Sequence, residues 1–376
     1  MAHYDLAIVG AGIVGLAHAL AAAKRGKRVV VIDRDAQANG ASVRNFGFVT
    51  VTGQEAGDCW DKARRAREIW GEVAAAAGIP ILLQGLVLTA RLDESEAVID
   101  AFLQTPMGEG CRKIDYHKAL DFVPVLRPEA VKTALYSPHE VRVESKTAIP
   151  LVTRYLAEHY GVDFLWQTSV TAVAPPRIET SKGIIEAEAA IVCPGDDFNG
   201  LFPERIAAYG ATRCKLQMLR IKPATPVSFK TALQSDLGLG RYLGYSMLPE
   251  ALALKARLDA EQGDARQNGI HLIATQSGDG SFVVGDSHHY AATPDPFASE
   301  WVDDLILKEF DTVVDLPGRM IAERWVGTYA SAPDRWRFTD TPSDAIRIVV
   351  VTAGCGASTA FGIGEETIND LYGAAA

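Results

Sequence analysis

The alternation of apolar and polar residues is clearest at the start of the chain. An apolar run, Leu6-Ala-Ile-Val9, ends at Gly10 and is followed by an Ala-rich amphipathic segment. A second apolar run, Val29-Val-Val-Ile32, closes on Asp33. Short apolar runs bounded by glycine are typical of buried strands, and the segment between these two has helical periodicity. The opening of the chain therefore predicts strand, tight turn, helix and strand.

Similar patterns predict further elements along the middle of the chain. Trp60, Ala63, Arg67 and Trp70 recur at helical spacing, and Gly78 suits a helix C-cap. Helices are accordingly predicted over 56–77, 93–104, 115–122 and 149–160, the last ending at Gly161. Strands are predicted over 82–89, 134–143, 162–173, 183–187 and 189–193.

Beyond residue 210 the pattern predicts a second sheet, which we expect to be antiparallel. Its strands are predicted over 215–221, 270–276 and 281–285, with Gly278-Asp-Gly280 as a hairpin turn. A helix over 294–316, a buried strand over 345–353 and a C-terminal helix follow. Strand-to-glycine turns recur at Gly195 and Gly354. These returns favour an α/β fold whose first domain is assembled from discontinuous segments, with an α+β lobe inserted between them.

The three glycines of the first turn form a G-x-G-x-x-G motif, Gly10, Gly12 and Gly15. The first glycine makes the turn, the second lets backbone approach a pyrophosphate, and the third lets the helix lie close to the strand. The helix N-terminus offers free N–H groups to phosphates, and Asp33 is placed to accept from a ribose diol. The motif predicts nucleotide binding; the alternative is a glycine-rich turn that binds no ligand. It does not distinguish FAD from NAD.

Composition and charge narrow the class of partner. A chain of 376 residues is long enough for about two domains, and its 48% hydrophobic and 22% charged residues are ordinary for a globular protein. The net charge of −10 argues against a nucleic-acid partner, because phosphate binding needs a basic face. An anionic substrate stays compatible, since a pocket can be locally positive.

The five cysteines are scattered and form no C-x-x-C pair. They predict reduced thiols rather than a disulfide frame or a metal site. The first strand begins almost at Met1, which leaves no room for a signal peptide, and no apolar run reaches about 18 residues. We therefore expect a cytoplasmic protein without a membrane span. Monomer and homo-oligomer are both left open.

Five segments in order resemble the D-amino-acid oxidase superfamily, within it the glycine oxidase and monomeric sarcosine oxidase branch. They are the glycine motif with Asp33-Arg34, Gly40-Ala-Ser-x-x-Asn-x-Gly47, Ala190-Ile-Val-Cys-Pro-Gly195, Glu323-Arg-Trp-x-Gly327 with Pro333-Asp334, and Gly354-x-Gly-x-Ser-Thr. The resemblance implies a Rossmann-like FAD domain of the glutathione-reductase type and an antiparallel-sheet substrate domain. The FAD-binding domain would comprise 1–50, 140–212 and 322–376, and the substrate-binding domain 51–139 and 213–321.

The same resemblance implies FAD in extended form and assigns residues to it. The turn at Gly354 would bring backbone N–H groups to the flavin, where a helix N-terminus favours hydride acceptance. In sarcosine oxidases a cysteine bonds to the flavin, and Gly327 stands at that position here, so non-covalent FAD is expected. The residues implied for FAD are Gly10, Gly12, Ile13, Val14, Gly15, Asp33, Arg34, Ala41, Ser42, Asn45, Phe46, Gly47, Val170, Pro194, Gly195, Gly327, Gly354, Cys355, Gly356, Ala357, Ser358 and Thr359.

The substrate pocket departs from the family pattern. Its relatives hold a carboxylate with arginine after the Trp-x-Gly segment, where this chain has Tyr329, and in the final turn, where no arginine occurs between Gly354 and Gly364. The anion is held differently, or the substrate is not a plain amino acid. Replacement donors are predicted at Arg44, Lys215, Gln217, Arg241, Tyr242, Tyr245, His288 and His289. Such a spread of donors suits a tetrahedral anion such as phosphonate.

The likeness is greatest to a superfamily branch associated with phosphonate catabolism, which implies 2-aminoethylphosphonate or its N-methyl form as substrate. The implied reaction is oxidation of an amine to an imine that water hydrolyses, with O2 reduced to H2O2. Tyr329 and His288 are expected to position the amine, with His288 also handling protons. The alternatives are a glycine, sarcosine or D-amino-acid oxidase, a flavin dehydrogenase with another acceptor, an NAD-dependent dehydrogenase, and a non-catalytic flavoprotein subunit.

Overall fold

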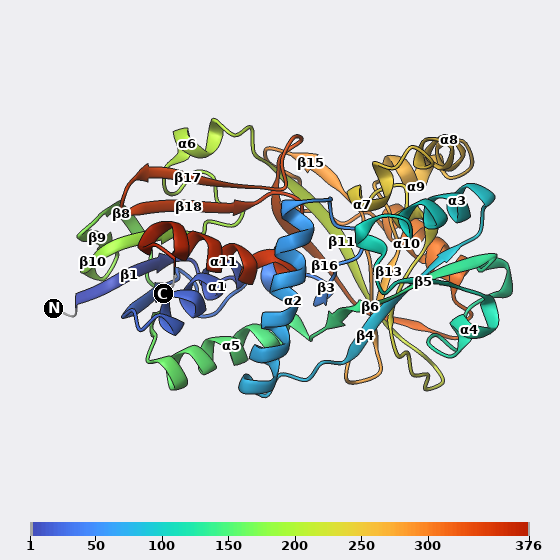
Figure 1. The fold of residues 1–376 in the computed structure, drawn as a ribbon, viewed down its shortest axis with the longest axis horizontal. Coiled ribbons are helices and arrows are strands. Elements are labelled where there is room, and N and C mark those ends of the chain that lie inside the picture. Colours follow the sequence, from blue (N-terminus) through green and yellow to red (C-terminus); the bar gives the residue numbers. More distant parts are fainter. Residues whose placement is uncertain (1–2, 375–376) are drawn as a thin grey trace.

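The computed structural model describes residues 3–374 and arranges the strands in two large sheets (Figure 1). The first sheet has eight strands in the order β17-β18-β10-β1-β2-β7, with β9 paired to the first half of β10 and β8 paired to β9. Their bounds are β1 (His3–Val9), β2 (Val29–Ile32), β7 (Asp163–Leu165), β8 (Val170–Ala174), β9 (Arg177–Thr180), β10 (Gly183–Val192), β17 (Arg337–Ser343) and β18 (Ile346–Val351).

Five neighbouring strands of this sheet, β18, β10, β1, β2 and β7, run parallel. Their side chains are mostly buried, as expected for strands covered on both faces. Because the strands are parallel, the turns after Val9, Ile32, Val192 and Val351 meet at one edge of the sheet. The predicted strand–turn–helix–strand opening is confirmed, with α1 (Ile13–Lys24) as the crossover between β1 and β2.

The second sheet has ten strands and is antiparallel apart from the β12–β4 pair. This confirms the predicted fold class, an α/β domain joined to an antiparallel-sheet lobe. The hairpin predicted around Gly278-Asp-Gly280 joins β13 to β14. The strands are β3 (Phe48–Val49), β4 (Leu83–Ala90), β5 (Arg112–Ile114), β6 (Thr133–Arg142), β11 (Thr212–Lys222), β12 (Ala232–Gln234), β13 (Ile273–Gln276), β14 (Phe282–Gly285), β15 (His289–Ala291) and β16 (Met320–Ser331).

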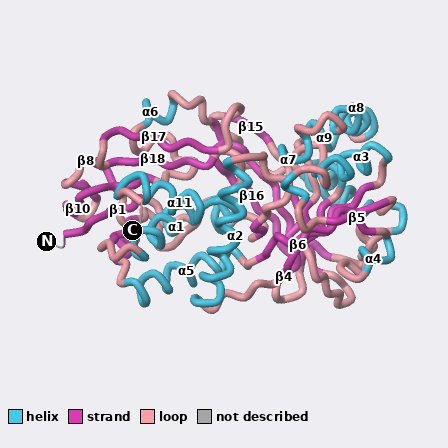
Figure 2. The backbone as a smooth tube through the Cα atoms, viewed as in Figure 1, coloured by secondary structure: helices cyan, strands magenta, loops and turns pink. Residues whose placement is uncertain are grey.

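The helices fall into two groups, one beside each sheet (Figure 2). Beside the first sheet lie α1, α2 (Asp58–Ala77), α5 (Ser145–Tyr160), α6 (Pro203–Ala207) and α11 (Gly356–Tyr372). The second lobe carries α3 (Asp93–Phe102), α4 (Tyr116–Leu120), α7 (Leu243–Ser246), α8 (Ala251–Glu261), α9 (Gly263–Gln267) and α10 (Glu300–Val313). None of the helices between residues 3 and 374 combines the length and apolarity needed to cross a bilayer.

The helix predicted over 56–77 is present as α2, and its apolar positions form the face that packs against neighbouring helices. Its apolar positions recur every three or four residues, and Gly78 ends it in the left-handed conformation with φ +67°. Trp70 packs edge-on against Phe361 of α11 at 5.1 Å between ring centroids, and its Nε1 donates to the Ala357 carbonyl at 2.8 Å. These two contacts join α2 to the first turns of α11.

Several predicted elements are wrong in extent: β10 joins the strands predicted over 183–187 and 189–193, and two others differ more. The strand over 162–173 is split into β7 and β8, because β7 continues the parallel sheet whereas β8 turns away to pair with β9. The helix over 294–316 begins only at Glu300, since the preceding segment with Pro294 and Pro296 is extended and bonds to β11. The helix α8 and the long strand β16 were not predicted. The residue ranges proposed for the two domains stay a prediction; β16 pairs along β11 in the second sheet.

A buried histidine on α1 links the fold to pH. Burial lowers the pKa of His18 from 6.5 to about 4, and its Nδ1 donates to the Val14 carbonyl at 2.7 Å. Between these pH values His18 is protonated in the unfolded chain but neutral in the folded chain. Folding is therefore weakened as the pH falls from 6.5 toward 4.

We expect this effect to cost the wild-type protein about 2 kcal/mol at pH 5 relative to pH 7.5. Replacing His18 with methionine, an apolar side chain of similar size, is expected to remove that part of the pH dependence. Urea unfolding of both proteins at the two pH values measures it. An equal pH dependence in wild type and His18→Met would contradict a neutral, buried His18.

Candidate active site

The first turn of the chain has the geometry that the glycine motif predicts. At Gly15 an added Cβ would overlap the Gly10 carbonyl oxygen, so only glycine lets α1 lie this close to β1. Asp33 Oδ2 accepts from the Ala11 amide at 2.7 Å, and Ser42 Oγ accepts from the Ile13 amide at 2.9 Å. These two side chains order the N-terminus of α1, where a phosphate would bind.

The loop after β2 folds back over this turn. Asn45 Nδ2 donates to the Ala41 carbonyl at 2.8 Å, and Asn45 Oδ1 accepts from the Gly47 amide at 2.7 Å. The Ser145 hydroxyl also donates to Asn45 Oδ1 at 2.7 Å. Asn45 therefore holds the loop in shape through its side-chain amide.

The last turn, between β18 and α11, lies across from this loop. Gly354 has φ +67°, and an added Cβ would lie 3.0 Å from the ring of Tyr329. The Ser358 hydroxyl accepts from the Thr50 amide at 2.9 Å and joins the turn to the segment after β3. The start of α11 is thereby held against both lobes.

One cavity of about 780 Å³ joins all of these turns to the second lobe. Its volume lies in the upper part of the range of small-molecule sites, and its lining follows the carboxyl edge of the parallel sheet. Of the residues implied for FAD, 20 line it: Gly10, Gly12, Ile13, Val14, Gly15, Asp33, Arg34, Ala41, Ser42, Asn45, Phe46, Val170, Pro194, Gly195, Gly327, Gly354, Cys355, Gly356, Ala357 and Ser358. The residues present thus fit an extended dinucleotide.

Two residues implied for FAD do not line the cavity. Gly47 is buried behind Asn45, and Thr359 is buried with its hydroxyl donating to the Cys355 carbonyl at 2.9 Å. Both residues support the cavity-lining turns without contacting the cavity. Arg34 lines the cavity, is exposed and pairs with Asp197 at 2.6 Å.

The other end of the cavity lies in the second lobe and carries a different chemistry. Of the predicted substrate contacts, Arg44, Arg241, Tyr242, His288 and Tyr329 line it. Arg241 Nη2 donates to the Tyr290 hydroxyl at 2.9 Å. Burial alone lowers the pKa of Arg241, but the neighbouring Tyr290 and Tyr329 hydroxyls outweigh it, and the pKa is raised. A charged guanidinium therefore faces the cavity.

Four predicted substrate contacts lie elsewhere. Lys215 is buried and bonds to Asp295 Oδ2 and the Phe297 carbonyl, and Gln217 bonds to Ser299 and Asp303. Both side chains point to the outer face of β11, where they hold the extended segment before α10. Tyr245 is fully buried against Phe102, and His289 bonds to Asn268 at 3.0 Å. As corrections, Lys215, Gln217, Tyr245 and His289 are structural residues outside the cavity lining.

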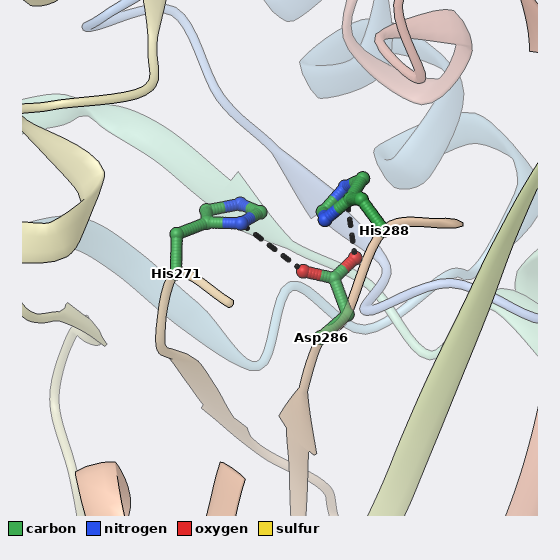
Figure 3. Close-up of side chains that lie close together, drawn as sticks. All are labelled: His271, Asp286 and His288. Carbon is green, nitrogen blue, oxygen red and sulfur yellow. Dashed lines mark ion pairs between the residues drawn. The ribbon is translucent and has the colours of Figure 1, made fainter. Parts of the chain in front are cut away.

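Two residues at this end were not predicted, His271 and Asp286 (Figure 3). Both are buried beside His288, with His271 Nδ1 3.4 Å from Asp286 Oδ1 and His288 Nε2 3.7 Å from Asp286 Oδ2. Burial raises the pKa of Asp286 to about 7 and lowers the pKa of His271 and His288 well below their usual range. The ring of Tyr329 lies next to this group, with its centroid 6.4 Å from that of His288. Burial raises the pKa of Tyr329 well above 10.

The predicted hairpin turn at residues 278–280 gave a partial indication of where His271 and Asp286 lie. Gln276 pairs with Phe282 and Ile273 with Gly285, so continuing the register outward brings the residues before Ile273 beside those after Gly285. The hairpin thus places both His271 and Asp286 at its open end, although the register alone pairs Asp286 with Leu272 and does not determine that the two side chains meet. The predicted pocket residues of this hairpin were His288 and His289, which both follow its second strand.

One family model matches nearly the whole chain, and a curated protein matches about half of it. The sequence model of the DAO family, described as FAD dependent oxidoreductase, matches residues 5–369. Glycine oxidase of Geobacillus kaustophilus (strain HTA426) is 26% identical over 206 residues, which are 51% of this chain and 54% of that protein. The chain thus matches only about half the length of this curated relative.

Two solved structures share the fold over nearly the whole chain. Glycine oxidase from Bacillus cereus ATCC 14579 is 17% identical with a TM-score of 0.78, covering 98% of this chain and 95% of that one. L-proline dehydrogenase from P. horikoshii is 19% identical with a TM-score of 0.79, covering 98% and 93%. At these identities the likeness concerns the fold.

Proposed function

We propose that this chain, which belongs to the DAO family of FAD dependent oxidoreductases, oxidises the C–N bond of a small amine that carries an anionic group. The observation that carries the proposal is Arg241, which faces the cavity beside the Tyr290 hydroxyl. An arginine fork with nearby hydroxyl donors suits the oxygens of an anion. Two similar proteins are named for glycine and L-proline, which supports an amine.

In this proposal the two ends of the cavity have separate tasks. The glycine turn, Asp33 and Ser42 would hold the adenine-dinucleotide half of FAD, and the turn from Gly354 to Ser358 its flavin end. Bound FAD supplies a two-electron oxidation of the amine to an imine, which water hydrolyses to an aldehyde and an amine or ammonia. Arg241 would bind the anionic group, and Tyr329 would position the amine against the last turn, whereas the predicted amine contact of His288 is not retained because its Nδ1 is bonded to the Gly269 carbonyl.

Within this class we favour an aminophosphonate, 2-aminoethylphosphonate or its N-methyl derivative. The positions at which relatives carry arginine hold Tyr329 and an arginine-free turn, so a carboxylate would lack its usual anchors. Arg241 and Tyr242 approach the cavity from one segment and His288 and Tyr290 from a second, and this set of polar groups offers more contacts than the two oxygens of a carboxylate would use. Glycine, sarcosine and D-amino acids are the competing substrates.

A substrate screen under anaerobic conditions tests this function. The FAD-loaded protein is mixed with 2-aminoethylphosphonate, its N-methyl derivative, glycine, sarcosine and a D-amino acid, and bleaching of the yellow colour is followed. We expect the aminophosphonates to bleach it fastest. Fastest bleaching by glycine or sarcosine would overturn the phosphonate assignment, and no bleaching by any amine would overturn C–N oxidation. Stoichiometric H2O2 in air would identify O2 as the acceptor.

FAD is expected to be held without a covalent bond. Gly327, at the position of the flavin-linking cysteine in related enzymes, lines the cavity and has no side chain to react. Precipitating the protein with acid should release the yellow colour into the supernatant. Colour that stays with the pellet would contradict this and would direct attention to Cys355, a cysteine of the last turn that also lines the cavity.

Removing the Tyr329 hydroxyl is expected to slow amine oxidation about tenfold. Tyr329 packs on Gly354 and faces His288, so its hydroxyl is placed to orient the amine at the last turn. Anaerobic stopped-flow measures the bleaching rate of Tyr329→Phe at saturating amine, and FAD content serves as the control for folding. An unchanged rate would remove Tyr329 from the positioning groups.

A further inference from the structure

His271, Asp286 and His288 form a cluster of three ligand-type side chains in the cavity wall (Figure 3). His271 comes just before β13, whereas Asp286 and His288 follow β14. One ligand atom of each residue lies within 4.8 Å of the other two, and each residue is more than nine-tenths buried. Two imidazoles and one carboxylate are a common ligand set for divalent transition metals.

The distances within the cluster do not correspond to hydrogen bonds. The separations of 3.4 Å and 3.7 Å exceed the 2.7–2.9 Å typical of a charge-assisted bond. His271 Nδ1 and Asp286 Oδ1 are buried and have no hydrogen-bond partner among residues 3–374. Ligand atoms held about 2.0–2.1 Å from one zinc ion in a tetrahedron would lie about 3.4 Å apart. The two observed separations, measured to the two different oxygens of Asp286, approach this spacing, and the three ligand atoms all lie within 4.8 Å of one another.

The orientation of His288 also suits a ligand. Its Nδ1 donates to the Gly269 carbonyl at 2.8 Å, which fixes the proton on that nitrogen. Nε2 is then left with its lone pair toward Asp286. A metal-binding histidine is commonly held in this way, with its second nitrogen bonded to a backbone carbonyl.

We propose that His271 Nδ1, Asp286 and His288 Nε2 bind one divalent transition metal ion of the zinc class, with a coordination position open to the cavity. Three protein ligands leave a fourth position free in a tetrahedral site. If the proposed function holds, that position takes an oxygen of the substrate's anionic group. Formal charges of +2 for the metal, +1 for Arg241 and −1 for Asp286 sum to +2, which matches a phosphonate dianion.

Metal binding is measured directly and without turnover. The FAD-loaded protein is treated with EDTA, exchanged into chelator-free buffer and titrated with ZnCl2 by calorimetry, with MgCl2 as the comparison. We expect one high-affinity Zn2+ per chain and no comparable Mg2+ binding. Asp286→Asn and His271→Gln are expected to weaken Zn2+ binding at least a hundredfold.

His289→Gln is the matched control, because this neighbouring histidine bonds to Asn268 and lies outside the cluster. It should bind Zn2+ as the wild type does. FAD content and circular dichroism verify that each variant is folded, and His288→Gln replaces any variant that is not. Absence of stoichiometric Zn2+ binding, or binding that survives in folded Asp286→Asn and His271→Gln, would overturn the site.

The link to the substrate has its own readout. Removing the metal is expected to raise KM for the aminophosphonate at least tenfold while FAD stays bound. Zinc binding with an unchanged KM would leave the metal site in place and overturn its contact with the anion. Amine oxidation in a protein that binds no zinc would overturn the metal site and leave the proposed function standing.

Discussion

Replacing Arg241 with methionine is expected to lower kcat/KM for the amine substrate about a thousandfold, or about 4 kcal/mol of transition-state stabilisation. Arg241 is held at the cavity by Tyr290, and methionine keeps part of its length without its charge. The loss should be expressed largely in KM, since the guanidinium binds a part of the substrate that does not react. Steady-state kinetics across substrate concentrations measure both constants.

Two further variants separate charge from geometry. Arg241→Lys retains the charge but not the planar fork, so it should recover only part of the loss. Arg257 on α8 is exposed and pairs with Glu261 at 2.8 Å, so Arg257→Met should behave as the wild type. If Arg241→Met retains wild-type kcat/KM, the anionic group is bound elsewhere and the proposed substrate class loses its main support.

Replacing Gly15 with alanine is expected to yield protein that is purified without colour. The new Cβ would overlap the Gly10 carbonyl oxygen, and backbone on both sides leaves no flexible side chain to move aside. Either α1 shifts away from β1 or the glycine turn deforms, and both changes displace the N–H groups meant for the pyrophosphate. We expect FAD affinity to fall at least a hundredfold, measured by titrating the apoprotein with FAD.

Gly71→Ala on α2 is the matched control, because nothing lies within 4 Å of its added Cβ. It should retain FAD and be more stable by about 0.5–1 kcal/mol, as alanine favours a helix over glycine. Circular dichroism distinguishes a folded, colourless Gly15→Ala protein from an unfolded one. A folded, yellow Gly15→Ala protein with unchanged affinity would contradict the role of close helix packing in the site.

The end of the cavity proposed to hold FAD was predictable from sequence because its contacts are largely local. The glycine turn, Asp33 and α1 belong to one strand–helix–strand unit, and the role of Gly15 follows from the close approach of two consecutive elements. Turns such as Pro194-Gly195 and Gly354-Cys355 were identifiable as the ends of buried strands. Parallel pairing then brings such ends to one edge of the sheet.

The substrate end was only partly predictable, since residue type does not reveal which face of a strand meets the cavity. Lys215 and Gln217 were expected in the pocket, yet they point to the outer face of β11 and hold the segment before α10. That contact joins residues about 80 positions apart, which no local pattern encodes. Tyr245 was expected in the pocket for its hydroxyl but fills the core of the second lobe.

The amino-acid sequence by itself determined the strand–helix–strand opening, the glycine turns that line one end of the cavity, and the hairpin of β13 and β14. Each depends on backbone geometry and periodicity over a few consecutive residues. Only the tertiary structure decided that His271, Asp286 and His288 converge and that Arg241 and Tyr329 face the same cavity. The reason is physical: burial, which lowers the pKa of the histidines and raises that of the carboxylate, arises from packing between segments distant in sequence.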